Sequence, residues 1–175
     1  MRKSTKEILA NSLKELLHKK EFRKITISDI TNNVNLNRKS FYYHFKDIFE
    51  LVEWIYINDM VKELNVINTY NNWQESYFFI TKYILKNKKF INATYKLSSL
   101  NKFIYTQTNS MILEIINKNS LYKDLDIIDK KFIANFYSHA FVGTLGDWIE
   151  SGMKETPNEI IDKMNIVIER IKKVK

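Results

Sequence analysis

The apolar residues of this chain recur at the spacing of an α-helix along almost its whole length. Five of them share one face of a first predicted helix, from Thr5 to Lys19: Ile8, Leu9, Leu13, Leu16 and Leu17. Ser4 and Glu7 are spaced as a capping box, in which each side chain accepts a hydrogen bond from a free backbone N–H of the first turn. Because the 175 residues include only 3 Gly and 1 Pro, tight turns are scarce. We therefore predict an all-α fold of about nine helices.

A second short helix is predicted from Thr26 to Asn33, and Thr26 and Asp29 form another capping pair at its start. Its buried side is expected to consist of three aliphatic residues: Ile27, Ile30 and Val34. A turn into a further short helix needs one residue at positive φ, and Asn35 tolerates that conformation better than most residues except Gly.

Leu36 is expected to pack into the angle between the two short helices, and Asn37 to cap a third helix from Arg38 to Phe45. Phe41 and Phe45 are four residues apart and should face the core. The order of helix, left-handed Asn, buried Leu, cap and helix predicts a helix-turn-helix.

In the remaining chain, the spacing of apolar residues predicts longer helices. Asp47 is placed to cap a long helix that reaches the Asn-rich segment 65–72, where a loop is expected unless Val66 and Ile67 prolong the helix. The later elements are expected at Trp73–Lys86, at Phe90–Asn119 as one or two helices, at Asp126–Gly152, and from Thr156 onward, where Pro157 and Glu159 suit a helix start.

Positive charge is concentrated in the first quarter of the chain. Residues 1–46 hold 11 Lys and Arg against 4 acids, whereas residues 47–175 hold 17 against 16. Nearly all of the net charge of +8 therefore belongs to the first segment. Such an excess favours a polyanion as partner. Charge alone equally allows a solvated basic surface.

The composition excludes several other classes of protein. The absence of Cys removes disulfides, thiolate metal sites and Cys nucleophiles. The first residues lack the apolar core of a signal peptide, and no stretch approaches the roughly 18 consecutive apolar residues of a membrane span. We expect a cytoplasmic protein that does not enter a membrane. The three histidines, His18, His44 and His139, belong to no nucleophile–base set, so we predict no enzymatic activity, no cofactor and no metal site.

The exposed side of the predicted third helix carries groups suited to a DNA duplex. Arg38 and Lys39 lie at its N-terminal end, the part of a recognition helix that usually enters the major groove. Four residues able to donate to phosphate oxygens follow: Ser40, Tyr42, His44 and Lys46. At the start of the preceding helix, Thr26 and Ser28 can present hydroxyl and backbone N–H groups to a phosphate.

Several of these positions also have a structural interpretation. Tyr42 could pack in the core, and His44 could cap the end of the helix. Arg38 and Lys39 could bind any duplex through charge alone.

Two segments of this region resemble the head of the TetR family of bacterial regulators almost position by position: Ile25–Ile30 and Val34–Asp47. Asn35 stands where that family usually has Gly. The resemblance implies a three-helix head, a long fourth helix leading into a helical ligand-binding body, and a homodimer. It also implies DNA contacts at nine positions: Thr26, Ser28, Arg38, Lys39, Ser40, Tyr42, Tyr43, His44 and Lys46.

The C-terminal part is similar to a subgroup of that family which includes regulators of dihydroxyacetone-kinase operons. The similarity lies in Phe136–Ile149, in Gly152–Met153 and in the helix after Thr156. Within the first segment, Gly143 and Gly146 indicate close approach of helices at a dimer interface or a break in the helix. The aromatic residues of the body form either a packed core or the lining of an effector pocket.

These features predict a DNA-binding domain over residues 1–47 and a helical effector-binding and dimerisation domain over residues 48–175. His139 and Trp148 are assigned to the core or the interface, with ligand contact as the alternative. The predicted function is operator binding by a homodimer formed through the last two helices, as a repressor that a small-molecule effector releases or modulates. The alternative keeps the fold and makes the protein a coactivator that acts through a partner regulator.

Overall fold

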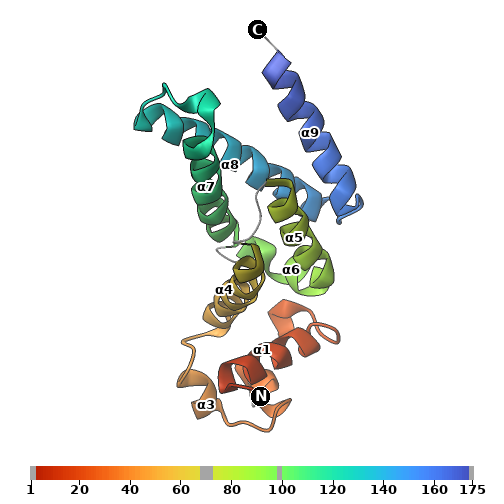
Figure 1. Ribbon diagram of the computed structural model, residues 1–175. Helices are drawn as coiled ribbons and strands as arrows, with labels where there is room; N and C mark the ends of the chain where they lie inside the picture. Colours follow the sequence, from red (N-terminus) through yellow and green to blue (C-terminus); the bar gives the residue numbers. More distant parts are fainter. Residues whose placement is uncertain (1–2, 68–72, 98–99, 174–175) are drawn as a thin grey trace. The chain divides into compact units, whose positions relative to one another are not determined.

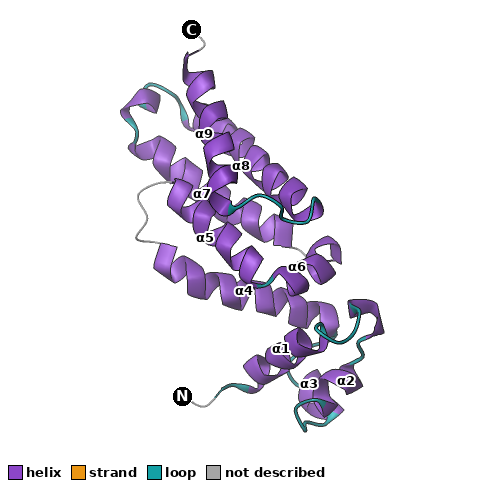
Figure 2. Cartoon of the chain, turned by 90° about the vertical axis from the view of Figure 1, so that its right-hand side faces the viewer, coloured by secondary structure: helices purple, strands orange, loops and turns teal. Residues whose placement is uncertain are grey.

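The computed structural model describes residues 3–67, 73–97 and 100–173, and every regular element in these ranges is a helix (Figures 1 and 2). In chain order the elements are α1 (Thr5–Leu16), the short 3₁₀ helix η1 (Phe22–Lys24), α2 (Ile27–Asn32), α3 (Arg38–Tyr42), α4 (Ile48–Ile67), α5 (Trp73–Lys86), α6 (Lys88–Thr94), η2 (Tyr95–Leu97), α7 (Leu100–Lys118), η3 (Ser120–Tyr122), α8 (Ile127–Glu150) and α9 (Pro157–Lys173). The all-α prediction is confirmed. No helix in the described ranges is long and apolar enough to cross a membrane.

The start signals read from the sequence are present in the structure. The Ser4 side chain accepts from the Glu7 N–H at 3.3 Å, and the Glu7 carboxylate accepts from the Ser4 N–H at 2.9 Å. Thr26 and Asp29 repeat this reciprocal pair at the start of α2. Thr156 and Glu159 form a third pair before α9, where Pro157 is the first helical residue.

The turn between α2 and α3 takes the conformation that its residues predict. Asn35 has a φ of 53°, in the left-handed region. The Leu36 N–H then donates to the Thr31 carbonyl at 2.9 Å, which closes the end of α2. Leu36 itself is half-buried, as is Val34, while Ile30 is fully buried.

Two helices end earlier than the apolar pattern predicts. α1 ends at Leu16 instead of Lys19, because the residues after Leu17 are polar and offer no face to bury. The Lys19 N–H still donates to the Leu16 carbonyl in a tight closing turn. α3 ends at Tyr42 instead of Phe45. Just beyond this end, the His44 N–H donates to the Phe41 carbonyl and tightens the last turn.

The described chain divides into two compact units, and each has its own apolar core. The first unit comprises residues 1–62 and 87–100, so α6 belongs with the N-terminal helices although it is distant in sequence. Its fully buried residues come from α1, α2, α3, α4 and α6, and include Leu9, Leu13, Ile30, Phe41, Ile55 and Ile91. The Tyr56 and Thr94 hydroxyls are hydrogen-bonded in its interior and join α4 to α6.

The second unit comprises residues 63–86 and 101–175. α5 lies beside α9 (Figure 1), and Gln74 donates to Asn165 between them at 3.2 Å. Tyr77 of α5 meets Phe141 of α8 with ring centroids 5.5 Å apart. Nearer the start of α8, the Tyr105 hydroxyl of α7 donates to Asn135 at 3.0 Å. The long helix α8 is therefore held by both α5 and α7.

Candidate nucleic-acid interface

A buried polar network fixes α1 against α2 and so sets the frame for the helix-turn-helix. The Ser12 hydroxyl is fully buried and donates to the Ile30 carbonyl at 2.7 Å. The Asn33 amide donates to the Ser12 hydroxyl at 3.2 Å and to the Glu15 carboxylate at 3.1 Å. The sequence interpretation missed this network. Its signal was a Ser on the apolar face of α1, between Leu9 and Leu16, where only a bonded hydroxyl is tolerated.

The start of α3 is set by Asn37, as predicted. The Asn37 side chain accepts from the Ser40 N–H at 2.8 Å and from the Ser40 hydroxyl at 3.2 Å. Ser40 is half-buried, and its hydroxyl proton is used within the cap. Phe41, one residue later, is fully buried, which orients the neighbouring side chains of α3 toward solvent.

Arg38 and Tyr42 lie one turn apart on the exposed side of α3. The guanidinium of Arg38 donates to the Tyr42 hydroxyl at 3.3 Å and lies 5.9 Å from the centre of its ring. Tyr42 is 51% exposed, so the structure does not place it in the core. Lys39, between them in sequence, is also exposed. The three side chains form one solvent-facing surface.

The turn after α3 continues this surface. Tyr43 is the C-cap of α3 and is 84% exposed. His44 is half-buried, with its ring 4.9 Å from that of Tyr43 and 6.4 Å from that of the buried Phe45. The Lys46 side chain is exposed, while its backbone N–H donates to the Glu50 carboxylate of α4.

Thr26 and Ser28 lie at the other end of the motif, at the start of α2. The exposed Thr26 hydroxyl donates to Asp29 at 2.9 Å, so its proton already serves the capping box. Ser28 is half-buried, and its carbonyl accepts from the Thr31 hydroxyl at 3.2 Å. All nine sequence-predicted positions thus lie in α2 and its N-cap, in α3, and in the turn that follows α3.

The basic residues of the first unit fall into two electrostatic groups. Lys14 and Lys20 are paired with Asp59 and Asp29, respectively. The hydrogen bonds from Lys20 and Thr26 lower the pKa of Asp29 to about 2, so this carboxylate stays charged to a lower pH than an ordinary Asp does.

The cations of α3 and of the turn that follows it form the second group. Arg38, Lys39 and Lys46 have no carboxylate partner within the described part of the chain. Their charge is not neutralised internally and is available to an anion. Among the residues that the structure describes, no group of three His, Asp or Glu side chains could bind a metal ion. What the motif offers is therefore cationic, phenolic and imidazole groups on one exposed surface.

Comparisons with known proteins agree with the fold. The family described as the transcriptional regulator C-terminal region (TetR_C_8) matches residues 71–170. A relative from Lactococcus lactis subsp. lactis (strain IL1403), the HTH-type dhaKLM operon transcriptional activator DhaS, is 26% identical over 180 residues, covering 98% of this chain and 94% of its own length.

A solved structure, that of the dihydroxyacetone kinase operon activator DhaS, has the same fold. It superposes with a TM-score of 0.74 at 23% identity, and the match covers 96% of each chain. The relatives are transcriptional regulators and not enzymes. The matched C-terminal family spans more than half of the residues, and the protein belongs to the TetR family of transcriptional regulators.

Proposed function

We propose that α3, the turn after it and the start of α2 form a DNA-binding surface within a domain of residues 1–47, and that residues 48–175 carry dimerisation and effector binding. The observation that supports this most directly is the exposed, unneutralised set of cations on α3 and its following turn: Arg38, Lys39 and Lys46. A regulator with this surface can bind a duplex through its phosphates and read the base edges between them.

The proposed contacts divide into two kinds. Arg38 and Lys39, at the N-terminal end of α3, reach base edges in the major groove. The 3.3 Å hydrogen bond between Arg38 and Tyr42 is long, so the guanidinium can leave the phenol for a guanine at little cost. The phosphate contacts are assigned to Tyr42, Tyr43, His44 and Lys46, and also to Thr26, Ser28 and Ser40. Of these, Thr26 and Ser40 have to release the hydroxyl protons that they donate within their helix caps.

A homodimer through α8 and α9 is the second part of the proposal. α8 exposes Phe132 at 71% and Phe136 at 60%, one turn apart, and α9 exposes Ile166 at 61%. A Cβ added to Gly143, further along α8, would meet nothing within 4 Å. Exposed large apolar side chains on two successive helices are typical of a surface that a second copy covers, and Gly143 allows a helix to approach closely.

The direction of regulation is proposed from the relative that covers nearly the whole chain. That relative is named as a transcriptional activator, which favours activation over the repression expected from the family resemblance. Repression released by a small-molecule effector remains the second candidate, because the helical body is rich in aromatic residues that can line a pocket. A reporter gene placed downstream of the protein's operator distinguishes the two. Expression of the reporter should rise in the presence of an activator and fall in the presence of a repressor.

Selection from a random duplex pool with the purified protein tests DNA binding directly. We expect a palindrome whose half-sites lie about one helical turn apart or a multiple of that distance. The variant Arg38→Ala should relax the sequence preference at one position of each half-site. Lys102→Gln, which removes an exposed cation from α7, is the matched control and should leave selection unchanged.

No enrichment from the pool would contradict autonomous operator binding. Enrichment that appears only when a second regulator is added would favour the coactivator alternative. An unchanged preference in Arg38→Ala would remove the assignment of base reading to the start of α3.

A further inference from the structure

A further cation of the first unit lies beside the turn that follows α3, although it belongs to α1. The ammonium nitrogen of Lys6 is 5.5 Å from the centre of the Phe45 ring. Phe45 stands between His44 and Lys46, two of the proposed phosphate contacts. The first turn of α1 therefore packs against the turn after α3, and its cation lies next to the proposed DNA surface.

The packing of Phe45 fixes where the Lys6 side chain lies. Phe45 is 2% exposed, and its ring is 5.8 Å from that of Phe41 and 6.0 Å from that of Trp54, so it belongs to the core of the first unit. Lys6 is half-buried, and Ala10, one turn further along α1, is buried. The Lys6 stem therefore covers the edge of this core while its ammonium group stays hydrated. A cation held in this way loses little freedom when an anion binds.

The Lys6 ammonium is not neutralised by a carboxylate within the described part of the chain. The neighbouring Glu7 carboxylate accepts from the Ser4 N–H and hydroxyl at the start of α1. Glu50, which follows the turn, accepts from the Lys46 N–H. Both acids therefore serve helix starts, and Lys6 belongs with the available cations of α3 and its turn rather than with the paired lysines.

We propose that Lys6 is a further DNA contact, whose ammonium group donates to a phosphate oxygen beside the phosphates bound by the turn after α3. The inference rests on the proposed function, because it needs a duplex on the surface of α3. It adds α1 to that surface, which the helix-turn-helix pattern alone does not indicate. Since Lys6 contacts the backbone and not base edges, its contribution should be the same for every duplex sequence.

A purely structural role for Lys6, as a cover for the Phe45 ring, leads to different expectations. Lys6→Met keeps an unbranched apolar stem over the ring and removes the charge, whereas Lys6→Arg keeps the charge. If Lys6 were only a cover, Met would replace it without loss of duplex affinity. If Lys6 is a phosphate contact, Arg should replace it and Met should not.

Fluorescence anisotropy with the full chain and a labelled duplex of mixed sequence, at several salt concentrations, tests the inference. We expect Lys6→Met to lower the magnitude of the slope of log affinity against log salt by about 1. Binding should weaken roughly fivefold to tenfold at about 0.1 M salt, as the loss of one phosphate contact requires. Lys6→Arg should keep both the slope and the affinity.

Lys19→Met is the matched control. Lys19 is an exposed cation just after the other end of α1, a helix of 12 residues, and it has no carboxylate partner among the described residues. A helix of this length is roughly 18 Å long, so Lys19 is far from the turn after α3. Lys19→Met should therefore change the slope much less than Lys6→Met.

Three results would overturn the inference and leave the proposed function standing. They are an unchanged slope in Lys6→Met, equal changes of slope in Lys6→Met and Lys19→Met, and equal losses of affinity in Lys6→Met and Lys6→Arg. In each of these cases the unaltered chain still binds the duplex. If the unaltered chain shows no salt-dependent binding at all, the proposed function and this inference are both wrong.

Discussion

The first and second units both expose side chains suited to binding a partner, but the chemistry of the two surfaces is opposite. α3 and its following turn present cations and phenols, with Tyr43 84% exposed. α8 and α9 present uncharged apolar groups, with Phe132 71% exposed. Under the proposed function, a polyanion covers the first surface and the apolar face of a second copy covers the other. Because each surface depends on different forces, single substitutions should separate DNA binding, self-association and folding.

The largest effect is expected inside the first unit, from Phe41→Ala. Phe41 is fully buried, so the truncation should lower the free energy of unfolding by about 3 to 5 kcal/mol. Tyr42→Ala, at the next position of α3, should leave stability nearly unchanged and weaken duplex binding. Chemical denaturation followed by circular dichroism measures the first quantity. Equal losses of stability in the two variants would show that Tyr42 is structural.

The second largest effect is expected on the apolar surface, from Phe136→Glu. A charge placed in a dimer interface is left without a partner, so the dissociation constant should rise about a hundredfold or more. The monomer should stay folded, because Phe136 is exposed in the single chain. Sedimentation velocity over a range of concentrations measures the change.

Ile57→Glu is the control for that variant. Ile57 is a half-exposed apolar residue of α4 in the first unit, outside the proposed interface. If self-association is equally weak in both variants, the effect of Phe136→Glu is not specific to α8. The contact then lies elsewhere or depends only on general surface hydrophobicity. Unchanged self-association in Phe136→Glu would contradict dimerisation through α8.

The sequence predicted the caps and the turn of the first unit because their signals are local. Each of these signals involves residues that are close together in the sequence. Examples are the capping boxes, the left-handed Asn35, and the buried Phe41 next to the exposed Tyr42. Local hydrogen bonds of this kind are readable from spacing alone.

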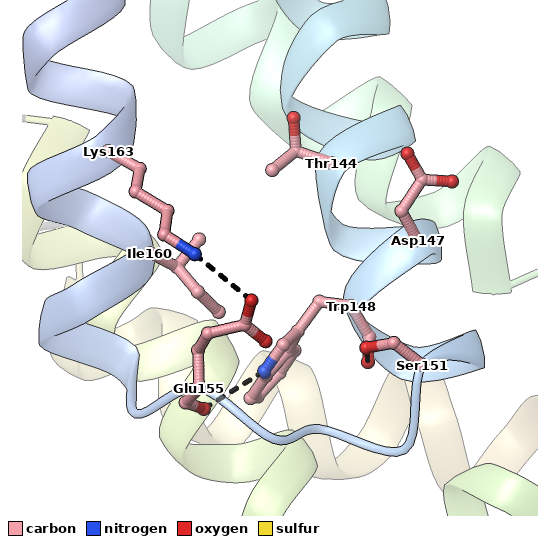
Figure 3. A pocket seen from close by; sticks show the side chains of 7 residues that line it. All are labelled: Thr144, Asp147, Trp148, Ser151, Glu155, Ile160 and Lys163. Carbon is pink, nitrogen blue, oxygen red and sulfur yellow. Dashed lines mark hydrogen bonds and ion pairs between the residues drawn. The ribbon is translucent and has the colours of Figure 1, made fainter.

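Contacts between distant segments could not be read in the same way. Lys14 of α1 is hydrogen-bonded to Asp59 of α4 and to Asn87, which precedes α6. The pairing of Tyr56 with Thr94 likewise joins residues 38 positions apart. No periodicity within one helix indicates which other helix will meet it, so the inclusion of α6 in the first unit emerged only from the structure. The cavity between α8 and α9 (Figure 3) is likewise lined by side chains from both helices, so the pattern of neither helix alone could indicate it.

A smaller effect is expected on the charged surface, from Lys46→Gln. If Lys46 contacts a phosphate, binding to every duplex should weaken, and the slope of log affinity against log salt should fall in magnitude by about 1. Fluorescence anisotropy at several salt concentrations measures both. Lys20→Gln is an informative comparison, because Lys20 is already paired with Asp29 and should change the slope less. Equal changes of slope in the two variants would contradict the division of the basic residues into paired and available cations.

The smallest effect is expected from the acid at the start of α2. The pKa of Asp29 is lowered to about 2 in the folded chain, from an ordinary value of 3.8. The charged form therefore stabilises the fold above pH 4, and this contribution is lost as the pH falls from about 4 to about 2. Asp29→Asn should lower the melting temperature slightly at pH 7 and should flatten its decline over that acidic range. If the variant and the unaltered chain lose stability in parallel below pH 4, the hydrogen bonds from Lys20 and Thr26 do not hold the carboxylate in its charged form.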